Sequence, residues 1–392
     1  MVKFKYYFPT GFQKKLKSSN FFKNSLSQQK TIYAEIKKQC QINASFYSSL
    51  FSESFLLSLV FCPPKSLSKK INEIYDNFPL LADRFNPYFN FRSYDLNFDV
   101  SFIKSKIDTD KNVALALKGK FITELDKILN EKSSILAEYF SVELKKATSP
   151  LKIYQICCRI RNVHVGTSVT PKGVRNIYPL WFGKLEKIFN YEALRTEFGQ
   201  VIIESSALKI CPYCNKRDVE ITYGKYVTAR PDLDHFYPKS RYPFLATTLY
   251  NLVPSCGFCN QKFKKSKDTY MKNMHPLIAG TRNYKVFSFV PLLDGPPIIL
   301  LNGCTKFKSN ITLFELEAEY QKDSIKREYR SINDKYESFK GLLGPKFEEF
   351  LNTKENITTM FDIGGERNIY NTSTYKFRLD TLSNLTNKNY KN

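Results

Sequence analysis

The sequence lacks a segment that would hold the protein in a membrane. Its most apolar early stretch, Phe55 to Cys62, is far shorter than the roughly 20 apolar residues of a membrane-spanning helix. The opening residues, MVKFKYYFPTGFQKK, hold no apolar core followed by small residues at a cleavage site, which a secretion signal requires. We therefore expect a cytosolic (cytoplasmic) protein with no membrane partner.

Acidic residues are also scarce. The 392 residues include 37 Asp and Glu against 60 Lys and Arg, so the formal net charge is +23. An excess of this size indicates a polyanionic partner, because Lys and Arg neutralise phosphates and release their counterions. A competing explanation stays open, since AT-rich coding enriches Lys, Asn, Phe, Tyr and Ile without selection for binding. The 42% hydrophobic share supports packed cores and excludes a disordered chain.

Cysteine usage does not fit a set of disulfides. The nine cysteines are odd in number, and thiols stay reduced in the cytosol, where paired cysteines more often bind metal. Four of them form two CxxC pairs. The other five have no ligand-like spacing, and we expect them to be buried structural thiols: Cys40, Cys62, Cys157, Cys158 and Cys304.

The chain divides into three regions by character. Residues 1–200 are expected to be mainly helical, with clear helical spacing of apolar residues over Ile122–Tyr139. Residues 201–280 concentrate cysteines, turn residues and basic residues. Residues 281–392 begin with an alternating stretch, Tyr284–Asn302, which predicts a β-hairpin and precedes further helices. The sequence thus predicts an α+β chain with mainly helical regions flanking a small central domain.

Two CxxC pairs open and close the central region. Cys211-Pro-Tyr-Cys214 and Cys256-Gly-Phe-Cys259 supply four soft thiolates, which suit tetrahedral zinc. Such a site adds folding free energy to a segment poor in apolar residues. A redox CxxC is the rival interpretation, but two pairs in one compact segment favour a structural zinc ion.

The insertion between the pairs holds a second set of polar residues. It contains Asp232-Leu-Asp234-His235-Phe-Tyr-Pro-Lys-Ser, and Asn251-Leu stands before the second pair, with Asn260 directly after it. An Asp-His pair alone is typical of an ordinary surface pair, but here its context is dense. A histidine can accept a proton near neutral pH, and a hard cation held by carboxylate and amide oxygens can bind phosphate and water.

Residues 211–267 resemble an HNH endonuclease with the ββα-metal fold, of the subgroup whose two CxxC knuckles hold structural zinc. The order CxxC, Asp-His, Pro-Lys-Ser, Asn-Leu, CxxC-Asn, Lys carries the resemblance. It covers about 60 of the 392 residues. The resemblance implies a β-hairpin whose second strand carries the Asp-His pair, then a loop, then a helix that carries the last metal ligand.

Roles follow from the resemblance residue by residue. His235 matches the general base that deprotonates the attacking water. Asp234 and Asn260 match the two ligands of a catalytic cation, magnesium or manganese, and Asp234 is preferred over Asp232 because it adjoins His235. Asn251 matches the residue that fixes the loop and orients the histidine. Asn in place of His at the third position keeps an oxygen ligand, which favours magnesium over a softer metal.

Basic residues near the motif are candidates for phosphate contacts, although a solvated face explains them equally well. They are Lys239, Arg241, Lys262, Lys264, Lys265 and Lys267. We expect His164 to be an ordinary packed or surface residue. His275 could approach the metal or phosphate, but a helix-ending turn before Pro276 explains it as well.

The leading hypothesis is a metal-dependent HNH nuclease that acts on DNA, with the flanks supplying substrate grip, autoinhibition or partner docking. Stand-alone proteins of this shape resemble nucleases of bacterial anti-phage defence systems, which implies a sensor or ATPase as a protein partner. The alternative is a zinc-stabilised nucleic-acid-binding module without cleavage activity. A third possibility is a zinc-stabilised interaction protein with no nucleic-acid role.

Overall fold

The computed structural model describes residues 1–39, 41–107, 110–226, 228–293, 296–301, 305–364, 368–388 and 390. Two of the five expected structural thiols, Cys40 and Cys304, lie outside these residues. Of the other three, Cys62 and Cys157 are buried, as expected, and Cys158 is half-buried. No helix in the described ranges combines the length and the apolar character that crossing a bilayer requires.

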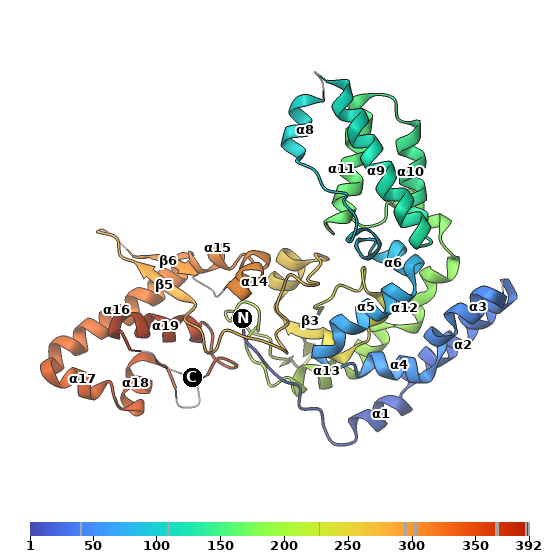
Figure 1. Cartoon of the computed structure of the whole chain (residues 1–392). Helices are drawn as coiled ribbons and strands as arrows, with labels where there is room; N and C mark the ends of the chain where they lie inside the picture. Colours follow the sequence, from blue (N-terminus) through green and yellow to red (C-terminus); the bar gives the residue numbers. More distant parts are fainter. Residues whose placement is uncertain are drawn as a thin grey trace. The chain divides into compact units, whose positions relative to one another are not determined.

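The chain forms two compact units, each assembled from segments that are far apart in sequence. The first unit comprises Met1–Lys17, Glu192–Phe236 and Leu249–Asn392, and the second comprises Ser18–Tyr191 and Tyr237–Thr248. The described elements are mainly helices with three antiparallel two-stranded sheets, which confirms a mainly helical α+β chain (Figure 1). The units cut across the ranges 1–200, 201–280 and 281–392 of the sequence analysis.

The second unit, called here the helical unit, has helices and short 3₁₀ turns as its described regular elements. Its helices are α2 (Asn20–Gln39), α3 (Gln41–Tyr47), α4 (Glu53–Val60), α5 (Leu67–Asn77), α6 (Pro79–Phe85), α7 (Tyr88–Phe91), α8 (Val100–Lys106), α9 (Lys111–Glu131), α10 (Ile135–Lys146), α11 (Pro150–His164) and α12 (Leu185–Ile188).

Helices α9, α10 and α11 lie side by side in this unit (Figure 1). The helical spacing over Ile122–Tyr139 spans two helices, because α9 ends at Glu131 and α10 begins at Ile135. The hydroxyl of Ser134 accepts a hydrogen bond from the Ala137 amide at 3.0 Å and caps α10, a position that serine favours. Apolar spacing continues across this cap, so periodicity alone did not reveal the break.

Asp83 is a buried polar centre of the helical unit. Its Oδ1 accepts hydrogen bonds from the hydroxyl of Ser134 at 2.8 Å and from the Asn90 amide at 3.1 Å. Its Oδ2 accepts from the Leu136 backbone amide at 2.8 Å and from the Tyr178 hydroxyl at 3.0 Å. Burial raises the pKa of Asp83, and these hydrogen bonds counteract that effect only in part. One carboxylate thus joins α6 to the start of α10 and to the segment before α12.

The first unit carries all the described strands, and we call it the strand-bearing unit. Its elements lie wholly or mostly within it: α1 (Phe12–Ser18), α13 (Tyr191–Ser205), β1 (Thr222–Tyr223), β2 (Thr228–Ala229), β3 (Asp232–His235), β4 (Leu252–Ser255), the π-helix η7 (Phe258–Lys264), β5 (Phe287–Val290), β6 (Ile298–Leu301), α14 (Lys308–Leu313), α15 (Leu316–Tyr320), α16 (Asp323–Leu343), α17 (Phe347–Phe350), α18 (Lys354–Phe361) and α19 (Tyr375–Thr386).

The hairpin predicted at Tyr284–Asn302 is confirmed. Strands β5 and β6 are antiparallel, with Phe287 opposite Leu301 and Val290 opposite Ile298. Two residues of its DGPP turn, 294 and 295, lie outside the described ranges. The Asp380 carboxylate of α19 accepts hydrogen bonds from the backbone amides of Val286 and Phe287 at 2.8 and 3.1 Å. The helix is therefore bound to the hairpin by hydrogen bonds as well as by packing.

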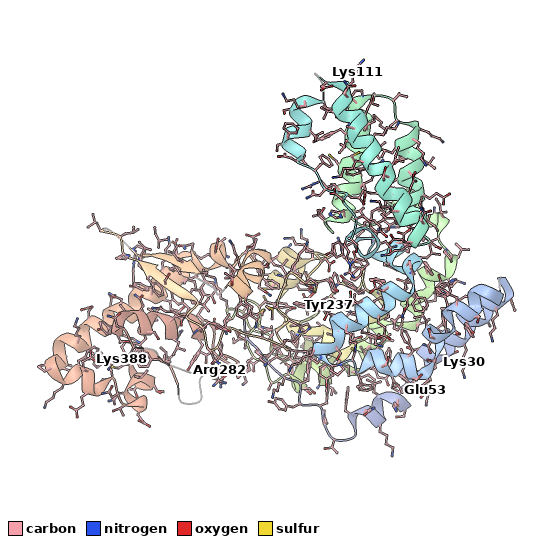
Figure 2. The ribbon with its side chains drawn as sticks, viewed as in Figure 1. Lys30, Glu53, Lys111, Tyr237, Arg282 and Lys388 are labelled. Atoms are coloured by element: carbon pink, nitrogen blue, oxygen red, sulfur yellow. The ribbon has the colours of Figure 1, made fainter. Side chains whose placement is uncertain are left out.

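Helices α16 to α19 share an apolar core beside this hairpin (Figure 1). Tyr336 of α16 meets Phe347 of α17 with ring centroids 5.2 Å apart, and Leu382 of α19 is fully buried. Lys388, labelled in Figure 2, follows α19 and pairs with Glu348 of α17 at 2.8 Å. The region after the central domain is therefore a packed part of the strand-bearing unit.

Replacing Asp83 with alanine should destabilise the helical unit by about 3 kcal/mol, because several buried donors lose a charged acceptor. Trp181 is the chain's single tryptophan and lies buried in this unit, so its fluorescence during urea unfolding reports on the unit directly. Asp76→Ala, at an exposed site on α5, should change the unfolding free energy by less than about 0.5 kcal/mol. Equal effects of the two substitutions would contradict the role given to Asp83.

Candidate zinc-braced active site

Four cysteines meet at one place in the strand-bearing unit. The sulfurs of Cys211, Cys214, Cys256 and Cys259 all lie within 4.8 Å of one another, and all four residues are buried. Tetrahedral zinc with Zn–S bonds of about 2.3 Å requires sulfurs about 3.8 Å apart, and Cys214 and Cys256 lie at 4.0 Å. Burial raises the pKa of the Cys211 thiol, whereas hydrogen bonds from the neighbouring cysteines lower the pKa of Cys214. The cluster can therefore bind zinc.

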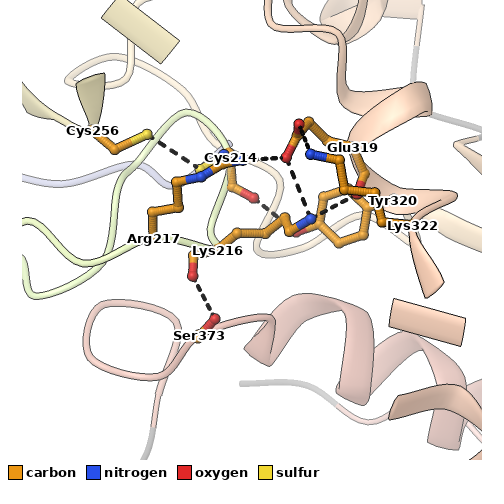
Figure 3. Close-up of polar contacts among 8 residues, drawn as sticks. All are labelled: Cys214, Lys216, Arg217, Cys256, Glu319, Tyr320, Lys322 and Ser373. Atoms are coloured by element: carbon orange, nitrogen blue, oxygen red, sulfur yellow. Dashed lines mark hydrogen bonds and ion pairs between the residues drawn. The ribbon is translucent and has the colours of Figure 1, made fainter. Parts of the chain in front are cut away.

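The first cysteine pair is anchored to distant parts of the chain (Figure 3). The Tyr320 hydroxyl donates to the Cys214 carbonyl at 2.8 Å, and the Ser373 hydroxyl donates to the Lys216 carbonyl at 2.6 Å. Glu319, almost fully buried, accepts hydrogen bonds from Arg217 at 2.6 Å and Lys322 at 2.5 Å. These contacts fix the knuckle against α15 and the segment before α19.

The guanidinium of Arg217, which donates to Glu319, also contacts the second cysteine pair. Burial alone would raise the pKa of Glu319, but its hydrogen bonds from Lys322 and Arg217 outweigh burial and hold that pKa below its ordinary value. The guanidinium of Arg217 also lies 4.1 Å from the ring centre of Phe258, which stands between Cys256 and Cys259. A cation–π contact thus joins the two knuckles beside the sulfur cluster.

The Asp-His pair lies on β3, which runs antiparallel to β4. Asp232 stands opposite Ser255 and His235 opposite Leu252, so β4 leads from the loop straight into the second knuckle. The order differs from the expected hairpin, because the strand with Asp-His comes first in the β3–β4 pair and β1–β2 forms a separate sheet. The Phe236 amide donates to the Asn251 carbonyl at 2.8 Å and extends this pairing past His235.

Asp234 is a buried member of a three-residue contact. Its Oδ1 accepts a hydrogen bond from the Lys264 ammonium at 2.9 Å, and its Oδ2 accepts from the Tyr213 hydroxyl at 2.7 Å. Lys264 also donates to the His235 carbonyl at 2.6 Å. The side chains of Lys264 and Asp234 are 1% and 3% exposed. Burial and the neighbouring carboxylate raise the pKa of Tyr213, which keeps its hydroxyl protonated as a donor.

Asp232 has different neighbours, although it lies on the same face of β3 two residues earlier. It is half-buried, and its Oδ2 accepts from the side-chain amides of Asn260 at 3.1 Å and Gln261 at 2.9 Å. Among the described residues it has no ion pair. The structure therefore brings Asn260, the expected cation ligand, to Asp232, and it places the buried Lys264 at Asp234.

The three histidines lie in different surroundings. His235 and Asn251 are both buried, at the end of β3 and at the start of the segment that forms β4. His275 is buried against the ring of Phe236, with ring centres 4.2 Å apart, and burial lowers its pKa to about 3. The Leu277 amide donates to His275 Nδ1 at 3.1 Å, which fits the turn expected there. His164 is half-buried and contacts the Phe91 carbonyl at 3.0 Å in the helical unit.

The six basic candidates for phosphate contact fall into two groups. Lys239, Lys262, Lys265 and Lys267 are exposed, whereas Lys264 and Arg241 are buried. Arg241 lies inside the helical unit, where its guanidinium donates to Asn86 at 3.2 Å and its carbonyl accepts from Tyr75. Of the six, the four lysines of the first group are therefore the residues that solvent reaches.

The sequence analysis weighed Asp232 against Asp234 and preferred Asp234, whereas two other residues of the site, Tyr213 and Glu319, were not singled out. Tyr213 stands between the cysteines of a knuckle, where nothing in the spacing marks a hydrogen-bond donor. Glu319 lies 105 residues after Cys214 and 60 after Cys259, and no local pattern marks it.

Comparison with curated proteins finds similarity to the Septu protein PtuB of Bacillus thuringiensis. The two sequences are 31% identical over 138 residues, a match that covers 31% of this chain and 45% of that protein. The chain thus spans less than half the length of this relative. No protein-family model matches the chain, and no solved structure matches it.

Cys256→Ser should lower the zinc content of the purified protein from about one ion per chain to well below one, because a hydroxyl replaces one of four thiolates. Metal analysis by mass spectrometry measures this content. Cys158→Ser, a substitution in the helical unit away from the cluster, is the matched control and should keep the wild-type zinc content. Equal zinc content in both variants would rule out the assignment of the cluster.

Lys264→Met should destabilise the strand-bearing unit by about 3–5 kcal/mol, because it leaves the Asp234 carboxylate buried without its cation. The double variant Lys264→Met/Asp234→Asn removes both charges and should recover most of that loss. Urea-dependent release of zinc to a coloured chelator reports on this unit. Lys262→Met, at an exposed site on the same π-helix, is the control and should have little effect.

Proposed function

We propose that the protein is a metal-dependent HNH endonuclease that hydrolyses phosphodiester bonds in DNA. The observation that carries the proposal is the meeting of the Asp-His strand and the Asn260 helix. β3 pairs with β4, the second zinc knuckle follows directly, and Asn260 on η7 donates back to β3 at Asp232. The Asp-His strand, the second knuckle and Asn260 follow one another as the HNH resemblance implies, which supports the proposal, although the Asp-His strand is the first of its pair and β1–β2 is a separate sheet.

His235 is the residue we assign as general base. A neutral imidazole ring can accept a proton from water, which is the role of a general base. The hydroxide formed attacks the phosphorus, one P–O bond forms and the bond to the leaving oxygen breaks. The backbone of His235 is fixed on both sides, by Lys264 at its carbonyl and by the Phe236–Asn251 hydrogen bond. These contacts position the base without using its ring.

The cation implied by the resemblance would neutralise charge on the phosphate oxygens. The ligand expected from the sequence, Asp234, does not fit that task as the structure has it. Both of its oxygens accept hydrogen bonds, one of them from a buried ammonium, and the residue is almost fully buried. No step of the reaction is therefore routed through a cation at Asp234.

Substrate binding is assigned to the exposed cations near the motif. Lys262, Lys265 and Lys267 stand on η7 and just after it, close in sequence to Asn260. Together with the formal charge of +23, they support a polyanionic substrate. Their contacts would be with phosphates, which position a nucleic acid without reading its sequence.

We place this activity in bacterial anti-phage defence, with an ATPase as the protein partner. The similarity to a Septu protein supports the defence role, because it agrees with the same assignment made from the HNH resemblance. The match covers less than half of that relative. The ATPase partner is therefore proposed here together with the defence role.

Zinc-loaded protein should nick or cut plasmid DNA when magnesium or manganese is added and should be inactive without the added cation. Leaving the cation out is preferable to chelation, which would also strip zinc. His235→Ala should lower the cleavage rate at least about 100-fold, since general bases contribute on this scale. His164→Ala is the control, because that histidine lies in the helical unit and should leave cleavage unchanged.

Cleavage that persists in His235→Ala would contradict the assignment of the base. DNA binding that weakens with salt, in a protein that cuts under none of these conditions even with its ATPase partner present, would favour the zinc-stabilised binding module instead.

A further inference from the structure

The two carboxylates of β3 differ in their electrostatic state. Asp234 is neutralised by Lys264, whose ammonium lies 2.9 Å from Oδ1 and is itself buried. Asp232 is half-buried, and among the described residues no cation pairs with it. One carboxylate is therefore already compensated inside the protein, and the other still carries an uncompensated negative charge.

A divalent cation at Asp234 would have to lie next to the Lys264 ammonium. Like charges at such a short distance repel strongly where water is excluded. Lys264 is also held in place, because it is fully buried and donates to the His235 carbonyl at 2.6 Å. Tyr213 occupies the other oxygen of Asp234 at 2.7 Å. Asp234 is thus a structural counter-ion that joins the first knuckle, β3 and η7.

Asp232 has the surroundings that Asp234 lacks. Two carboxamides, from Asn260 and Gln261, converge on its Oδ2. A carboxylate can only accept hydrogen bonds, so both amides turn their nitrogens toward it when no cation is present. Rotation of each amide by half a turn would present its oxygen in the same place. Asp232, Asn260 and Gln261 would then offer three hard oxygen donors, the kind that magnesium and manganese prefer.

We infer that the catalytic cation binds at Asp232, with the side-chain oxygens of Asn260 and Gln261, and that Asp234 is not its ligand. The inference rests on the proposed function, since it concerns the metal that the nuclease requires. It keeps Asn260 in the role expected from the sequence and moves the carboxylate by two residues.

The test is manganese binding to the full-length, zinc-loaded protein. Mn²⁺ is titrated into the protein, and the free ion is measured by its electron paramagnetic resonance signal. Asp232→Asn keeps the shape of the side chain and removes the charge, and it should weaken Mn²⁺ binding at least about tenfold. Asp218→Asn, at an exposed carboxylate of the same unit, is the matched control and should bind like the wild type.

Asp234 is tested in the double variant Asp234→Asn/Lys264→Met, because Asp234→Asn alone would leave a buried ammonium without a partner and could unfold the unit. The double variant should bind Mn²⁺ within about twofold of the wild type, since the proposed ligands are unchanged. Loss of binding in the double variant, with Asp232→Asn binding normally, would overturn the inference. A wild-type protein that binds no Mn²⁺ would overturn it as well.

Plasmid cleavage by the same preparations separates this inference from the proposed function. If DNA is cut and Mn²⁺ binding depends on Asp234, the nuclease assignment stands and the inference fails. If Mn²⁺ binding depends on Asp232 and no DNA is cut, the metal site stands and the nuclease assignment fails.

Discussion

Four cysteine sulfurs gathered at one point constrain the strands and turns around the candidate site. The strands beside them, β3 and β4, have only four residues each, too few for an isolated hairpin to be stable. A zinc ion at the cysteines would cross-link the segment before β3 to the segment after β4 and supply the missing stability. The contacts of Glu319 and Tyr320 then fix the first knuckle to α15, so the metal-bound region is part of a larger core.

The buried Lys264–Asp234 pair has a different task from the zinc. It carries no net charge, and replacing such a pair with apolar groups is often neutral for stability, so stability alone is a weak reason for its presence. Its geometry is specific, however, because one ammonium fixes a side chain of β3 and the backbone of the next residue. The position of β3 against η7 is thereby fixed at His235, the assigned base, and at the residue before it.

Much of this site was predictable from the sequence because short-range spacing governs it. CxxC pairs bring two sulfurs together whatever the fold, and the two pairs indeed meet. The β5–β6 hairpin followed from alternation over Tyr284–Asn302 in the same way. The helix break at Ser134 was missed, since a cap residue does not interrupt apolar periodicity.

The choice between Asp232 and Asp234 shows where the sequence stops being informative. Both residues lie on one face of β3, and adjacency to His235 was the sole argument for Asp234. What distinguishes them is the burial of Lys264, a lysine in a run of exposed lysines. The sequence does not distinguish Lys262, Lys264 and Lys265. The π-helical turn of η7 determines which of their side chains points inward. Charge compensation is therefore a property of packing that no local pattern encodes.

The path of the chain also bears on how the site is held. After His235 and Phe236 the chain enters the helical unit at Tyr237, and it returns to the strand-bearing unit at Leu249, two residues before Asn251. Within the helical unit this segment is packed firmly, with Tyr242 accepting a hydrogen bond from Asn86 at 2.8 Å. The residues assigned as base and as loop anchor thus stand at the two ends of a segment that belongs to the other unit.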